Sequence, residues 1–143
     1  NIALSCICRY DRTIDQVAAE SMVIFYGEVL VLQKIGKIVS SGEEQEYKVT
    51  VYPQIVYKGK PRKKYFFKGY SFYNDTDELT NSSPDGLMRI ASGGCGLHLN
   101  MGSKYVVLIE KGTKPIFSWC SEHILPKGTE KFDFFMSNIR DKL

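Results

Sequence analysis

The four cysteines constrain the fold of this 143-residue chain more than any other feature. Cys6 and Cys8 form a Cys-x-Cys pair near the start, and Cys95 and Cys120 lie far downstream, each at the edge of an apolar run. Residues i and i+2 of an extended strand point to the same side. Cys6 and Cys8 could therefore each reach a different distant cysteine, which would fasten the N-terminal segment to the middle of the fold.

Zinc binding is an alternative to disulfides. Cys95 with His98, and Cys120 with His123, form Cys-x-x-His pairs, and zinc accepts thiolate and imidazole ligands in tetrahedral sites. Structural zinc sites usually draw their ligands from tight knuckles, whereas His98 lies in an alternating, strand-like run. We therefore favour disulfides over zinc and over free thiols, and we expect both histidines at the surface. An even number of well-separated cysteines is typical of an oxidising compartment.

The composition predicts a single domain over residues 1–143. Hydrophobic residues make up 43% of the chain, which is enough for a substantial core, and the net charge of +3 permits a polyanion partner without implying one. No apolar run approaches the roughly 18 residues that would span a membrane. Residues 3–5, Ala-Leu-Ser before Cys6, have the small-x-small form of a signal-peptide cleavage site. Together with the cysteines, they predict a secreted or extracellular protein.

The periodicity predicts a mostly β fold with a helix at each end. Helices are expected at 12–20, capped by Thr13 or Asp11, and at 129–143, capped by Thr129. Strand-like runs cover 22–33, 46–58, 64–73, 87–91, 104–111 and 115–120. Glycines inside strands, Gly27 and Gly69, favour the sharp bends of a small closed barrel.

The longest predicted loop, 74–86, is polar and rich in turn residues. It carries two N-x-S/T sequons, at Asn74 and Asn81. Both could bear glycans if a eukaryote secretes the protein.

The densest basic stretch is a candidate glycan-binding site. Its residues are Lys58, Lys60, Arg62, Lys63, Lys64 and Lys68. Such a cluster can hold sulfated glycans or nucleic acid phosphates, although a solvated loop is the commoner outcome. Tyr65, Phe67, Phe72 and Tyr73 interleave with these cations and could stack on bases, but strand aromatics mostly fill cores, and we expect that here.

No enzyme motif is present, and we expect no enzymatic activity and no cofactor. The sequence lacks HExxH, GxSxG, P-loop and dinucleotide-binding patterns. A Cys-His dyad can be imagined at Cys95–His98 or Cys120–His123, but it would use the best disulfide candidates. The acidic residues cluster in predicted loops, where solvation is the default.

Several segments, in order, resemble a known family. They are Cys6-Ile7-Cys8, residues 20–29 (ESMVIFYGEV), residues 56–59 (VYKG), Cys95-Gly96, residues 102–107 (GSKYVV) and residues 118–121 (SWCS). Together they resemble the netrin-like (NTR) domain, and within it the N-terminal domain of the tissue inhibitors of metalloproteinases (TIMPs). The resemblance covers roughly residues 6–125. It implies a five-stranded OB-fold Greek-key barrel with flanking helices.

The resemblance also implies the disulfides Cys6–Cys95 and Cys8–Cys120. The chain departs from the inhibitors in three respects. The third N-domain cysteine of the family falls at about Ala19 and its partner is also missing, the C-terminal cysteine-rich subdomain is absent, and five residues precede Cys6. Losing both members of a pair leaves no odd thiol, so the cysteine pattern remains self-consistent.

The resemblance implies an inhibitory ridge, made of Cys6, Ile7, Cys8, Arg9, Gly94 and Cys95. In the family, the free α-amine and carbonyl oxygen of the first cysteine chelate the zinc of the target protease, and the next side chain enters the specificity pocket. An amide nitrogen cannot chelate in this way because its lone pair is delocalised. With Ser5 attached, Cys6 has no free amine, so the resemblance implies metalloproteinase inhibition if residues 1–5 are removed. The alternative is a non-inhibitory netrin-like module that binds a glycosaminoglycan or an extracellular protein; we expect no nucleic acid partner.

Overall fold

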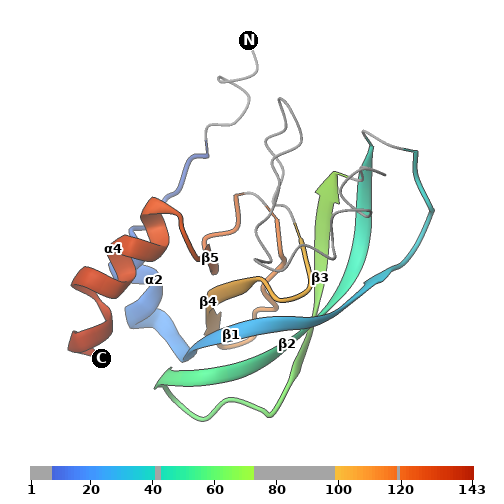
Figure 1. The fold of residues 1–143 in the computed structure, drawn as a ribbon. Helices are drawn as coiled ribbons and strands as arrows, with labels where there is room; N and C mark the ends of the chain where they lie inside the picture. Colours follow the sequence, from blue (N-terminus) through green and yellow to red (C-terminus); the bar gives the residue numbers. More distant parts are fainter. Residues whose placement is uncertain (1–7, 41–42, 73–98, 119) are drawn as a thin grey trace.

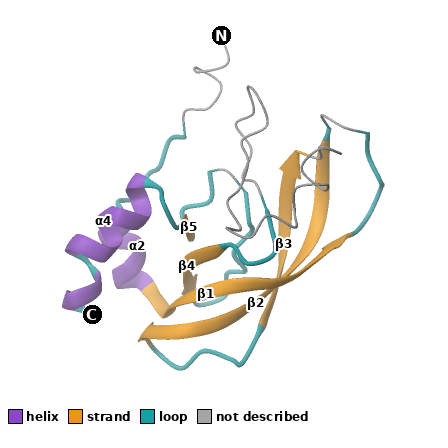
Figure 2. Cartoon of the chain, in the orientation of Figure 1, coloured by secondary structure: helices purple, strands orange, loops and turns teal. Residues whose placement is uncertain are grey.

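The structure is a computed structural model that describes residues 8–40, 43–72, 99–118 and 120–143. Within these ranges the chain is mostly β, with a helix before the sheet and another after it (Figure 1 and Figure 2). The predicted loop 74–86 with Asn74 and Asn81, and the predicted strand 87–91, lie outside the described residues.

Five antiparallel strands form one sheet in the order β3-β2-β1-β4-β5. Their bounds are Ser21–Lys34 for β1, Glu44–Lys58 for β2, Tyr65–Phe72 for β3, Lys104–Glu110 for β4 and Ile124–Pro126 for β5. The long strand β1 pairs with β2, and its first half also pairs with β4. Its register with β2 shifts between Tyr26 and Gly27, and a Cβ at Gly27 would lie 2.8 Å from the Phe25 ring. The interior glycine thus permits an irregularity in β1, as the sequence predicts.

The sheet is open, so the predicted closed barrel is not confirmed. β3 and β5 lie at opposite edges of the sheet, with no pairing between the two strands. The predicted strand 115–120 is wrong in its described part, where the chain makes a single parallel bridge from Phe117 to Gly69 of β3. Pro115 has no N–H to donate to a ladder, which limits pairing here. The fifth strand lies instead at Ile124–Pro126, which the sequence analysis did not predict.

Both predicted helices are confirmed, with shorter bounds. α2 spans Ile14–Glu20, and Thr13 caps it through a capping box with Gln16. α4 spans Glu130–Asn138, and the Thr129 side chain accepts a hydrogen bond from the Phe132 N–H. The predicted range 129–143 runs beyond α4, because the chain continues as a short 3₁₀ helix, η1, over Arg140–Lys142.

Two hydrophobic clusters lie on opposite faces of the sheet. One lies between β1–β4 and the bridge segment and is rich in aromatic residues; its buried members include Phe25, Val49, Phe67, Tyr105 and Phe117. The other lies under α2 and α4, which sit together beside β4 and β5 (Figure 1); its members include Val17, Ile24, Leu108, Leu125 and Phe135. β4 contributes to both, because its residues alternate between the two faces. The helices thus cover the second face of the sheet at β4 and β5, whereas Phe66 of β3 stays exposed.

Candidate functional site

The N-terminal segment is covalently attached to the segment after the Phe117 bridge. Cys8 and Cys120 form a disulfide, with 5.5 Å between their Cα atoms and 112 residues of sequence separation. This is one of the two pairings that the resemblance implies, and it removes both cysteines from any zinc site or Cys-His dyad. Of the predicted ridge, Cys8 and the exposed Arg9 are described, whereas Cys6, Ile7, Gly94, Cys95 and the disulfide Cys6–Cys95 lie outside the described residues. His98 also lies outside them.

A partly buried cluster of charges strengthens the same attachment. The Arg12 guanidinium donates hydrogen bonds of 2.8 and 2.6 Å to the two carboxylate oxygens of Glu110, at the end of β4. It also contacts Glu20, at the end of α2, and Glu122, just before β5. Bidentate arginine–carboxylate pairs are among the stronger and more directional ion pairs. Arg12 therefore holds residues 8–13 against β4, α2 and the segment before β5.

His123 belongs to this cluster, so its predicted surface position is wrong. Its side chain is only 12% exposed, and its Nε2 atom lies 2.5 Å from Glu110 Oε2. The Arg12 guanidinium, and after it His123, lower the pKa of the Glu110 carboxyl to about 2. In turn the Glu110 carboxylate, and after it Glu122, raise the pKa of the Arg12 guanidinium. The central pair of the cluster, Arg12 and Glu110, is therefore fully ionised at neutral pH.

The same cluster contains a possible set of metal ligands. Glu110, Glu122 and His123 bring their ligand atoms within 4.8 Å of one another. However, the Arg12 guanidinium already contacts both carboxylates, so a metal ion would have to displace a cation that the chain supplies itself. We therefore assign the cluster a structural role. Sequence reasoning missed it because nothing in the pattern links Arg12 to a glutamate 98 residues away.

The structure separates the six predicted glycan-binding cations into different environments. The Lys58 ammonium donates to the carbonyl oxygens of Ala18 and Ala19, at 3.1 Å each, near the end of α2. Lys68 lies 3.9 Å from a carboxylate oxygen of Glu46. These two lysines thus have protein partners that offset part of their charge.

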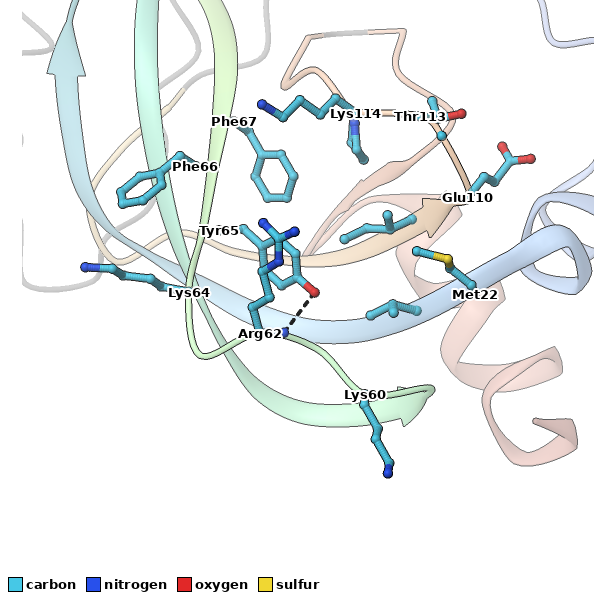
Figure 3. Close-up of a pocket in the computed structure, with 14 residues that line it drawn as sticks. Met22, Lys60, Arg62, Lys64, Tyr65, Phe66, Phe67, Glu110, Thr113 and Lys114 are labelled. Carbon is cyan, nitrogen blue, oxygen red and sulfur yellow. Dashed lines mark hydrogen bonds between the residues drawn. The ribbon is translucent and has the colours of Figure 1, made fainter.

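Three of the remaining cations, Lys60, Arg62 and Lys64, lie around a pocket (Figure 3). We call it the β3 pocket; it lies between the start of β3, the start of β1 and the turn after β4, and its volume is about 700 Å³. Lys114 enters its rim from that turn and was missed by the sequence analysis, because it is 46 residues from Lys68 in the chain. Lys63 is exposed on the loop before β3 and does not line the pocket.

The aromatic residues of β3 divide between the core and the surface. Tyr65 stacks between Phe25 and Phe67, with centroid distances of 5.2 and 5.6 Å, so the expected core role of these rings is confirmed. Phe66 points the other way and is 46% exposed. The ammonium groups of Lys48 and Lys64 lie 4.4 and 5.4 Å from its ring centroid, within cation–π range. The side chains of Phe72 and Tyr73 lie outside the described residues.

Comparisons with known proteins returned no match, whether to a family model, a curated protein or a solved structure. The resemblance to netrin-like domains accordingly stays a prediction. Among the residues that the structure describes, no helix is long and apolar enough to cross a membrane.

Proposed function

We propose that the chain is a secreted, netrin-like protein of the TIMP type, which inhibits a zinc metalloproteinase by binding and without catalysis. The observation that carries the proposal is the disulfide Cys8–Cys120, because the family pattern pairs these two positions and the sequence spacing alone left the pairing open. A disulfide also fits an oxidising compartment. The inhibitory ridge would comprise Cys6, Ile7, Cys8 and Arg9 with the Gly94–Cys95 segment.

An OB-type barrel is the fold that we propose with this function. The segment between β4 and β5 supports it, because it returns to the free edge of β3. The Phe117 N–H donates to the Lys68 carbonyl, and the Tyr70 N–H donates to the Phe117 carbonyl, both at 2.8 Å. A parallel contact of this kind at the edge of β3 is what closure of the sheet would require. Gly69 allows this close packing, since a Cβ there would lie 2.7 Å from Val49 Cγ2, 2.8 Å from Leu99 Cδ1 and 3.3 Å from the Phe117 Cβ.

The attachment of the N-terminal segment suits an inhibitor that presents its own terminus. The disulfide fixes Cys8, and the ion pairs fix Arg12, so the residues between them are held at both ends. A segment that is ordered before binding loses less conformational entropy when the protease closes around it. In the proposed mechanism, the α-amine and carbonyl oxygen of Cys6 bind the protease zinc and displace its water. An α-amine has a pKa near 8, so a useful fraction is neutral at pH 7–8.

Three forms of the chain test this proposal. One begins at Asn1, one begins at Cys6, and the third begins at Cys6 with an acetylated α-amine, which keeps the sequence but removes the basic lone pair. We expect the free Cys6 form to inhibit a panel of zinc metalloproteinases and the other two forms to fail, because only the first can chelate. Inhibition by none of them would overturn the proposal. Equal inhibition by all three would overturn chelation as its mechanism.

The alternative function, a glycosaminoglycan-binding module, receives less support. Lys58 and Lys68 already have protein partners, and Lys60, Arg62 and Lys64 surround a concave apolar surface. A polyanion with a hydrophilic body would meet these cations but would leave that apolar surface without a partner. The pocket itself is the subject of the inference below.

A further inference from the structure

The β3 pocket has the size and lining of a small-molecule site. Its floor contains Val23, Phe67 and Ile109, hydrophobic side chains that are no more than 8% exposed. Its volume of about 700 Å³ falls within the roughly 300–1,000 Å³ of typical ligand sites. None of its lining residues belongs to the proposed inhibitory ridge. A ligand bound here would therefore represent a second function.

The rim of the β3 pocket is positively charged. Lys60, Arg62, Lys64 and Lys114 surround the opening, and Glu110 carries the one carboxylate among the described lining residues. Both carboxylate oxygens of Glu110 accept hydrogen bonds from Arg12, outside the pocket. Arg12 offsets part of this negative charge, but Glu20 and Glu122 share the same guanidinium, so Glu110 compensates the rim cations in part. An anion at the rim would lie nearest Arg62 and Lys114, because the Lys60 side chain points away from the pocket (Figure 3) and the Lys64 ammonium lies 5.4 Å from the centroid of the Phe66 ring.

Arg62 is placed to bind such an anion over the aromatic floor. Its backbone N–H donates to the Tyr65 hydroxyl at 2.9 Å, which fixes the turn that carries it (Figure 3). Its guanidinium carbon lies 6.0 Å from the centroid of the Tyr65 ring. A guanidinium held near an aromatic face can bind a carboxylate, sulfonate or phosphate through its edge while its face stays on the ring.

The apolar surface continues beyond the β3 pocket. A second hollow of about 390 Å³ shares Phe66, Phe67, Lys114 and Pro115 with it and reaches Ile35. The two hollows together offer an elongated apolar surface with cations along it. This shape suits a ligand whose apolar ring or chain extends well beyond its anionic group.

We propose that the β3 pocket binds an anionic amphiphile, a small molecule with one acidic head group and an aromatic or aliphatic body. The head group lies at the rim, between Arg62 and Lys114, and the body covers Phe67, Val23 and Ile109. Surface lysines alone also protect sheet edges against aggregation. That role, however, requires neither a 700 Å³ hollow nor buried hydrophobic side chains at its floor.

Three probes test separately how the head group and the body contribute to binding. The probes are 8-anilinonaphthalene-1-sulfonate, its uncharged analogue N-phenyl-1-naphthylamine, and inorganic sulfate. With the folded full chain, we expect the sulfonate to bind at one site and the uncharged analogue to bind at least about tenfold more weakly, because it leaves the rim cations unpaired. Sulfate up to about 10 mM should not displace the sulfonate, since it lacks the body. Equal affinity for the two aromatic probes, or displacement by sulfate, would overturn the proposal.

Charge-matched variants test the location of the site. Neutralising the rim with Arg62→Gln, Lys64→Gln and Lys114→Gln should weaken sulfonate binding at least about tenfold. The control variant, Lys37→Gln, Lys127→Gln and Lys142→Gln, removes the same charge from exposed positions outside the pocket and should change affinity less than about twofold. All six side chains are exposed, so both variants should fold, which circular dichroism checks. Equal weakening by both variants would show a mere net-charge effect. Displacement of the sulfonate by a heparin disaccharide at the same concentration would favour a glycan instead; either result refutes the proposal.

Discussion

Replacing Cys8 and Cys120 together by serine should destabilise the protein by an amount that also reports on the other two cysteines. The disulfide joins residues that are 112 positions apart in the chain. Its main effect is to reduce the conformational entropy of the unfolded chain, and this effect grows with the logarithm of the loop that it closes. The size of the loop depends on whether Cys6 and Cys95 are also joined.

The two cases predict different losses in the free energy of unfolding. If Cys8–Cys120 is the sole cross-link, the loop spans the full separation, and the loss is about 4.8 kcal/mol. If Cys6–Cys95 is also present, the chain between the two bonds is only about 27 residues, and the loss falls to about 3.6 kcal/mol. The smaller loss is the expected result, because the proposed family pattern contains both bonds.

Urea unfolding of the oxidised wild type and the double variant measures this difference. The thiol content of the denatured, unreduced wild type gives an independent count of the free cysteines. The fully reduced wild type serves as a control that lacks every cross-link. A loss below about 2 kcal/mol would refute the argument, because the disulfide would then not restrict the unfolded chain as its loop length requires. Two free thiols together with a loss near 3.6 kcal/mol would refute it as well.

Two further predictions concern the charge cluster and a turn. The pKa of Glu110 in the folded state is lowered to about 2, so its pairing stabilises the protein above about pH 4.5, and this stabilisation is lost as the pH falls from 4.5 towards 2. Glu110→Gln should therefore flatten the dependence of Tm on pH in this window. Parallel Tm profiles for the wild type and the variant would contradict the lowered pKa. Gly59→Ala should lower the free energy of unfolding in urea clearly more than Gly112→Ala. Both glycines have positive φ, at 72° and 74°, but only at Gly59 would the new Cβ lie 2.1 Å from a backbone oxygen, that of Met22. Equal losses of free energy in the two variants would refute the steric argument.

The local elements could be predicted from sequence because their signals are local. Thr13 and Thr129 mark the helix starts by capping chemistry that acts over three residues. The apolar run over Lys104–Glu110 identifies β4, since a strand buried on both faces has no polar alternation. The short strand Ile124–Pro126 gave no such signal, because three residues are too few for a periodicity to appear.

The candidate sites required contacts that sequence distance conceals. The basic stretch contains Lys60, Arg62 and Lys64, which line the β3 pocket, but it could not reveal that Lys58 and Lys68 have protein partners. Lys114 joins the rim only because the turn after β4 lies opposite β3. Similarly, Arg12 meets Glu110 through the fold and not through any spacing in the chain.

Strand β4 also limits how this chain can vary. All five residues from Tyr105 to Ile109 are buried, and neighbouring positions face different hydrophobic clusters. A polar or larger side chain at any of these positions would disturb one cluster, and a shift by one residue would exchange the two faces at once. Related chains should therefore tolerate insertions in the turns on either side of β4 but none within it. In an alignment of divergent relatives, we therefore expect these five positions to stay hydrophobic and free of gaps.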